Sequence, residues 1–179
     1  MRASELVVGA GPPEQAPALA LEALPPVGVA APVIDRSGFA GRVVLVHFFA
    51  TWCEPCREEL PALNRLSTRH ADTTTAILGV DVGEGDPKVR RFMETTPVKF
   101  PILMDRDRSA ARAWDVTVLP STFLIGPDGH LRARSEGPVE WDRPEAEAVI
   151  TGLLATQAIG SDQIPQSPRT SRDIGRSAQ

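Results

Sequence analysis

The feature that most restricts the fold is an apolar run, Val43–Ala50, that leads directly into the segment TWCEPC and both cysteines of the chain. Near-continuous apolar and β-branched residues are typical of a strand that is buried on both faces of a sheet. The residues from about Cys53 to His70 have the pattern of a helix. The sequence therefore predicts a buried strand, a tight C-x-x-C turn and a helix.

Strand and helix patterns alternate along the chain after this unit. Strands are expected at 77–82 and 100–105, helices at 86–96 and 108–116, and a hairpin around Asp128-Gly129 with strands on both sides. A last helix is expected at about 143–156. The order β-α-β-α-β-α-β-β-α implies an α/β fold, with a central sheet covered by helices on both faces.

The 179 residues fit one domain with room for tails. We expect a flexible segment over 1–16, a domain over 17–156 and a disordered tail over 157–179, because both ends are rich in Pro, Ser, Gly, Gln and Ala. Residues 18–24 alternate in polarity and predict an edge strand. Two cysteines cannot build a disulfide scaffold, so the domain must rely on its own core.

Composition excludes some classes of function. A net charge of −4 with no basic stripe gives no indication of a nucleic-acid partner. Apolar runs stay far short of the ~20 residues that cross a bilayer, so no membrane span is expected. The first twenty residues do not follow a signal-peptide pattern, because charged residues and prolines interrupt them. That absence fits a cytosolic chain, a mature or truncated form, or a wrongly assigned start.

The C-x-x-C motif predicts redox chemistry. Cys53 would lie at a helix N-terminus, where unpaired backbone N–H groups favour the thiolate. It would attack a substrate disulfide, and Cys56 would resolve the mixed disulfide, with Trp52 as an apolar wall beside the sulfur. Two incidental core cysteines are the less favoured interpretation. A zinc site needs two more ligands, and neither His70 nor His130 has an obvious way to supply one.

Glu59 lies on the apolar stripe of the expected helix together with Cys56, whereas Glu58 falls on the neighbouring face. Partial burial would raise the pKa of Glu59 and let it exchange protons near neutral pH. From spacing alone, a solvated glutamate at the edge of the core is an equally good interpretation.

His47 points into one covered face of the sheet by the period-two alternation of its strand. If the C-x-x-C helix covers that face, the imidazole lies beneath the cysteines and can act as a proton relay for Cys56. On the residues alone, a buried histidine hydrogen-bonded to a neighbour is the favoured interpretation.

The segments VVLVHFFATWCEPCREELPAL, GVDVGEG, FPILMDRD and AWDVTVLPSTFLIGPDGHL together resemble the thioredoxin superfamily, and within it the TlpA/ResA-like thiol-disulfide oxidoreductases of bacteria. The resemblance covers about residues 32–156. It implies a thioredoxin fold, with a central mixed sheet flanked by helices, an αβ insertion and an N-terminal extension. The redox-active disulfide would be its own reactive group, with no bound cofactor and no metal.

The resemblance also assigns roles by position. It makes Cys53 the exposed nucleophile, Cys56 the buried resolving thiol and Glu59 the acidic residue that tunes the pair. Pro120 matches a cis-proline that exposes the backbone of Leu119 for pairing with a substrate segment. Two departures concern proton transfer: His47 stands where the relatives carry Asp or Asn, and Phe49 where a Trp is typical.

The implied function is an extracytoplasmic reductase of protein disulfides, in the periplasm or on the outer face of the cytoplasmic membrane. Apocytochrome c and copper-protein assembly factors are the expected clients, an upstream thiol donor is the expected partner, and a monomer is expected. A copper-delivery protein using the same thiols is the alternative, as is a thiol peroxidase, although FFATWCEPC lacks the Pro and Thr that precede a peroxidatic cysteine. A cytoplasmic general reductase remains open, and the motif does not fix the direction of electron flow.

Overall fold

The computed structural model describes residues 6–9, 14–71 and 74–160. Their main sheet has the order β1-β9-β8-β5-β6-β7, with β2 also paired to β9. The strands are β1 (Val7–Val8), β2 (Glu14–Gln15), β5 (Val43–Phe49), β6 (Thr75–Val82), β7 (Ile102–Asp105), β8 (Ser121–Ile125) and β9 (His130–Glu136). Strands β5, β6 and β7 are parallel, whereas β8 runs antiparallel to both of its neighbours. The expected central mixed sheet is confirmed.

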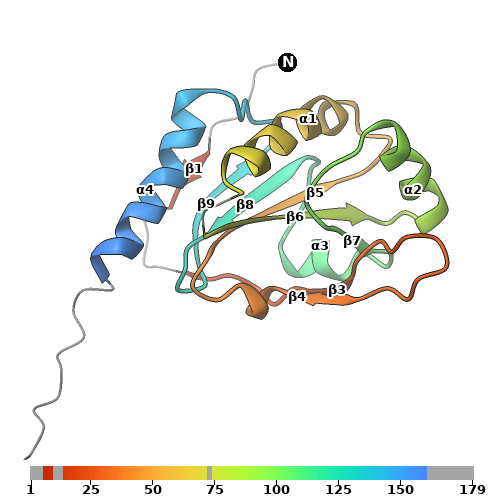
Figure 1. Cartoon of the computed structure of the whole chain (residues 1–179), viewed down its shortest axis with the longest axis horizontal. Coiled ribbons are helices and arrows are strands. Elements are labelled where there is room, and N and C mark those ends of the chain that lie inside the picture. Colours follow the sequence, from red (N-terminus) through yellow and green to blue (C-terminus); the bar gives the residue numbers. More distant parts are fainter. Residues whose placement is uncertain (1–5, 10–13, 72–73, 161–179) are drawn as a thin grey trace, which may run out of the picture.

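Each face of this sheet has its own hydrophobic core. One face packs against the helices α1 (Glu54–Arg69), α2 (Asp86–Thr95) and α4 (Pro144–Gly160), and it receives Leu45 and Phe49 of β5. The other face receives Val46 and Phe48 of β5 and packs against α3 (Ser109–Ala113) and the segment that includes β3 (Ala20–Glu22). Figure 1 shows α1, α2 and α4 on one side of the sheet and α3, β3 and β4 on the other. The alternation of β5 therefore decides which side chains reach α1.

The predicted order of strands and helices from Val43 onward is confirmed, with boundaries shifted by a few residues. The edge strand expected at 18–24 is present, and it is shorter than that range. Ala20–Glu22 pairs with β4 (Val33–Asp35) in a separate two-stranded sheet, followed by a short 3-10 helix, η1 (Arg36–Phe39). An isolated bridge from Ala23 to Leu103 ties this hairpin to β7.

The tails differ from expectation where the structure describes them. Residues 7–8 and 14–15 are strands paired with β9, so the prediction of a wholly flexible segment over 1–16 is wrong for these residues. Helix α4 continues to Gly160, past the expected limit at 156. The remaining tail, 161–179, and residues 1–5 and 10–13 lie outside the described residues. Within the described part of the chain, none of the helices is long and apolar enough to span a membrane.

Candidate active site

The two cysteines lie where β5 gives way to α1, and they form a disulfide. Cys53 is the N-cap of α1, and its Sγ accepts a hydrogen bond from the Cys56 backbone N–H at 3.3 Å. Pro55 occupies the first turn, where a missing N–H costs nothing. The helix N-terminus predicted for Cys53 is therefore present, and its orphan N–H groups face the sulfur that would carry the thiolate charge.

The exposure of the site is uneven. Cys56 is fully buried, and Cys53 is only 5% exposed in this disulfide form, less than an exposed nucleophile suggests. Trp52, by contrast, is 63% exposed immediately before Cys53. An exposed indole beside a nearly covered sulfur places an apolar contact surface at the entrance to the disulfide.

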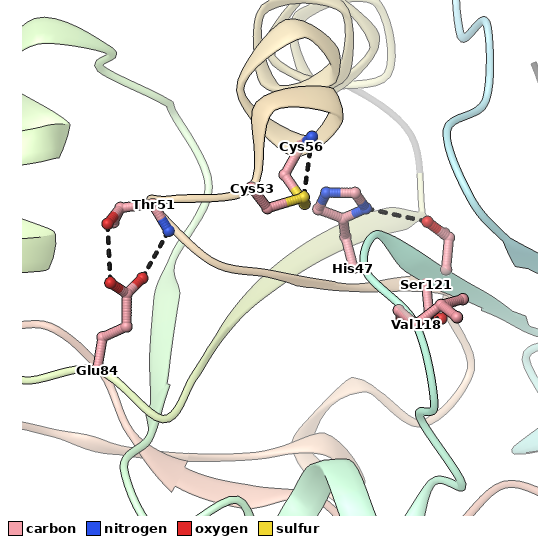
Figure 2. The surroundings of a disulfide bond; sticks show 8 residues. His47, Thr51, Cys53, Cys56, Glu84, Val118 and Ser121 are labelled. Atoms are coloured by element: carbon pink, nitrogen blue, oxygen red, sulfur yellow. Dashed lines mark hydrogen bonds between the residues drawn. A yellow bond between two sulfur atoms is a disulfide. The ribbon is translucent and has the colours of Figure 1, made fainter. Parts of the chain in front are cut away.

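A second loop meets the disulfide from the start of β8. The Leu119–Pro120 peptide bond is cis, as the resemblance implies. Val118 and Ser121 flank that dipeptide in the surroundings of the disulfide in Figure 2, and Val118 is exposed. Within the described residues no hydrogen bond engages the backbone of Leu119. Its N–H and C=O therefore remain available to an extended segment from outside, the interaction expected for Leu119 and Pro120.

Glu59 is buried on α1, one turn beyond Cys56. Its Oε1 accepts a hydrogen bond from the indole Nε1–H of Trp141. Burial raises the pKa of Glu59 to about 8, although the hydrogen bonds with the Trp141 indole and the Val139 backbone act in the opposite direction. The carboxyl therefore holds a proton at neutral pH. Glu58 is exposed, as expected.

His47 belongs to the face of β5 that α1 covers, and Figure 2 shows its ring beside the disulfide. Its Nδ1 lies 2.9 Å from Thr122 Oγ1, and its Nε2 is buried with no hydrogen-bond partner among the described residues. Burial lowers the pKa of His47 to about 3, so the ring is neutral at physiological pH. Both interpretations of His47 therefore apply in part: it is a buried, hydrogen-bonded histidine, and it lies beneath the cysteines.

Three further residues near the site were not identified from the sequence. Trp141 reaches Glu59 across 82 positions of sequence. Glu84, between β6 and α2, binds Thr51 just before the C-x-x-C motif, and Asp81 lies fully buried at the end of β6. For Asp81 the sequence did hold a signal: it is the single carboxylate in the apolar run ILGVDV, and strand alternation places it on the α1 face of the sheet.

Comparisons with known proteins agree with this arrangement. A family model described as "AhpC/TSA family" matches residues 13–134, more than half of the chain. The chain belongs to the AhpC/TSA family. Within it, the chain is 40% identical over 98 residues to "Thiol-disulfide oxidoreductase ResA" of Bacillus subtilis (strain 168), covering 55% of each protein. It is 38% identical over 96 residues to the protein of the same name from Geobacillus kaustophilus (strain HTA426), covering 54% of this chain and 55% of that one. The match thus spans about half the length of these curated relatives.

Solved structures in this family's neighbourhood confirm the thioredoxin-like fold. A putative thiol:disulfide interchange protein DsbE from Chlorobium tepidum superposes with a TM-score of 0.71 at 25% identity, covering 84% of this chain and 99% of that one. A DsbF homologue from Corynebacterium diphtheriae also gives 0.71, at 17% identity, covering 85% and 94%. The second likeness concerns the fold alone. The resemblance to ResA-like members of the thioredoxin superfamily is confirmed.

Proposed function

We propose that this protein is a thiol-disulfide oxidoreductase that reduces disulfides in client proteins through the Cys53–Cys56 couple. The observation that carries the proposal is the Cys53–Cys56 disulfide at the N-terminus of α1, next to the loop with the cis Leu119–Pro120 bond. The similarity to proteins named thiol-disulfide oxidoreductase supports it.

The reaction uses only the two sulfurs and their protons. In the reduced protein, the Cys53 thiolate attacks one sulfur of the client disulfide, and the departing client thiolate takes up a proton. Cys56 then loses its proton and attacks Cys53 Sγ, which releases the second client thiol and leaves the Cys53–Cys56 disulfide. Two electrons pass to the client, and no bound cofactor is required. An upstream thiol donor reduces the disulfide again.

The surrounding residues would bind the client segment and exchange protons with the cysteines. Trp52 and Leu119 would hold an extended client segment against the disulfide, through apolar contact and backbone hydrogen bonds respectively. Glu59, protonated at neutral pH and one turn from Cys56, would exchange the proton that Cys56 loses and regains. His47 would offer a neutral ring beside the same sulfur.

The finer assignments rest on the family relationship. We place the protein outside the cytoplasmic membrane as a monomer, with apocytochrome c before haem attachment, or a copper-protein assembly factor, as its client. The relatives named ResA and the interchange proteins with the same fold support this placement.

The test is to trap the intermediate. With a disulfide-bonded peptide that carries the haem-attachment motif C-x-x-C-H, the Cys56→Ser variant should accumulate a mixed disulfide at Cys53, identified by mass spectrometry. Cys53→Ser is the control and should form none. A reduction potential near −270 mV, the thioredoxin end of the range, indicates a reductase, whereas one near −120 mV reverses the proposed direction of electron flow. If no mixed disulfide forms at Cys53, the proposal fails.

A further inference from the structure

A buried carboxylate joins the loop that carries Cys53 to the next strand of the sheet. Glu84 lies in the connection from β6 to α2, and its side chain is almost fully buried. Its Oε2 accepts a hydrogen bond from the Thr51 backbone N–H at 2.5 Å, and its Oε1 accepts one from Thr51 Oγ1 at 2.8 Å. Figure 2 shows this pair of hydrogen bonds on the opposite side of Cys53 from His47. One side chain therefore binds both polar groups of a residue two positions before the nucleophile.

Glu84 is held in place as a carboxylate. Lys88, in the first turn of α2, brings its Nζ to 2.6 Å from Glu84 Oε1. Burial by itself would raise the pKa of Glu84, but the hydrogen bonds from Lys88, Thr51 and Asp81 outweigh it and hold that pKa below its ordinary value. A charged acceptor makes stronger hydrogen bonds than a neutral one.

The chain geometry directs Glu84 toward the active site. Gly83 adopts φ of +76°, a left-handed conformation that glycine reaches without strain, and the backbone turns there at the end of β6. The Gly83 N–H also donates to the Asp105 carbonyl at 2.9 Å, which anchors the turn to β7. Glu84 therefore projects from a fixed turn at the carboxyl end of β6.

The turn that Glu84 binds is short and has few other supports. The Cys53 N–H donates to the Ala50 carbonyl at 3.1 Å, and Cys53 then enters α1. While the disulfide is closed, a covalent bond also fixes Cys53 relative to Cys56. When the disulfide opens, the position of Cys53 depends on the helix, the Ala50 hydrogen bond and Thr51.

We propose that Glu84 is a positioning residue for the Cys53–Cys56 couple: by binding Thr51, it keeps the Cys53 turn ordered when the disulfide is reduced. An ordered turn raises the effective concentration of the Cys53 sulfur at Cys56, which favours closure of the disulfide. Favoured closure means a more negative reduction potential and a stronger reductant. The proposal builds on the proposed function, but it concerns an equilibrium of the protein's own disulfide.

The test is the equilibrium of each variant with glutathione. Thr51→Val removes the hydroxyl and keeps the shape and the charge of the site, and it should weaken disulfide closure about threefold. Glu84→Gln should weaken closure about tenfold, a shift of about 30 mV toward less negative potential for this two-electron couple. Thr51→Ser keeps the hydroxyl and should keep the wild-type reduction potential.

Three controls separate positioning from other effects. Glu58→Gln removes one negative charge from an exposed position on α1 and should leave the potential unchanged. The double variant of Glu84→Gln with Thr51→Val should show a shift smaller than the sum of the two single shifts, because both changes weaken the hydrogen bond between Thr51 Oγ1 and Glu84. The third control is the free energy of unfolding of each variant in its oxidised and reduced forms. A contact that stabilises both forms equally cannot change the reduction potential.

The outcomes are distinct. If Thr51→Val has the same reduction potential as Thr51→Ser, Glu84 does not position Cys53. The same conclusion follows if the potential shifts of Thr51→Val and Glu84→Gln simply add in the double variant. If Glu84→Gln fails to fold, the Thr51 pair still decides the question. If the wild-type protein does not reduce client disulfides but the potentials shift in the expected pattern, the proposed function fails and the positioning role stands.

Discussion

Replacing Glu59 by glutamine should remove a pH dependence of stability that the fold builds in. The pKa of this carboxyl is about 8 in the folded protein, against an ordinary value of 4.5. The folded state therefore binds more protons than the unfolded state between these two values. The free energy of unfolding should fall as pH rises through that window and level off above about 8.

The size of this change in unfolding free energy follows from the interval between the unfolded and folded pKa values of Glu59. Each pH unit is worth about 1.4 kcal/mol, so keeping Glu59 buried costs about 3 kcal/mol at pH 7 relative to pH values below 4.5. Glutamine has the same shape, retains an oxygen for the Trp141 indole and does not titrate. Glu59→Gln should thus match the wild type near pH 4 and exceed its unfolding free energy by about 3 kcal/mol at pH 7.

The assay is urea unfolding of the oxidised protein between about pH 4 and pH 9, followed by far-ultraviolet circular dichroism. The disulfide form is chosen because its cysteines do not titrate. Asp81 titrates in the same window, but it is present in both proteins and cancels in the difference. Glu58→Gln is the matched control and should follow the wild type. A Glu59→Gln curve parallel to the wild-type curve at every pH would refute the reasoning.

Three other substitutions test the remaining buried polar groups. Asp81→Asn should raise the unfolding free energy at pH 7 by up to about 4 kcal/mol, because burial, and after it the neighbouring Glu84, raises the pKa of Asp81 from 3.8 to about 8. Urea unfolding at a series of pH values measures this gain, and an unfolding free energy with the same pH dependence as the wild type would contradict it. Trp141→Phe deletes the donor to Glu59 and should move the upper end of the Glu59 window to higher pH, whereas an unmoved window would mean the indole has no effect on the carboxyl. His47→Asn should change the thiolate titration of the reduced protein, followed by ultraviolet absorbance, because the ring lies beside the disulfide. An unaltered titration would leave His47 a packing residue only.

Local patterns in the sequence account for much of the site. The apolar run of β5, the C-x-x-C turn and the periodicity of α1 predict a strand, a cysteine at the helix N-terminus and a glutamate on the apolar stripe, because strand alternation and helix periodicity act over a few residues. Spacing alone left the burial of that glutamate undecided. Strand alternation also assigned His47 to one face of the sheet. The cis peptide bond at Pro120 was expected from resemblance to a family, since the residues around it do not by themselves favour the cis form.

Only the tertiary structure decided which distant groups meet. The order of the strands places β6 beside β5 and so brings Glu84 to Thr51, 33 positions away. The chain segment after β9 delivers Trp141 to Glu59, and the pairing of residues 7–8 with β9 gives order to a segment that composition alone assigned to a tail. Such contacts depend on sheet order and on the packing of helices against it, which bring together residues whose local sequences carry no record of one another. The sequence thus determined the reactive pair and its helix, and the fold determined the charges and hydrogen bonds that surround it.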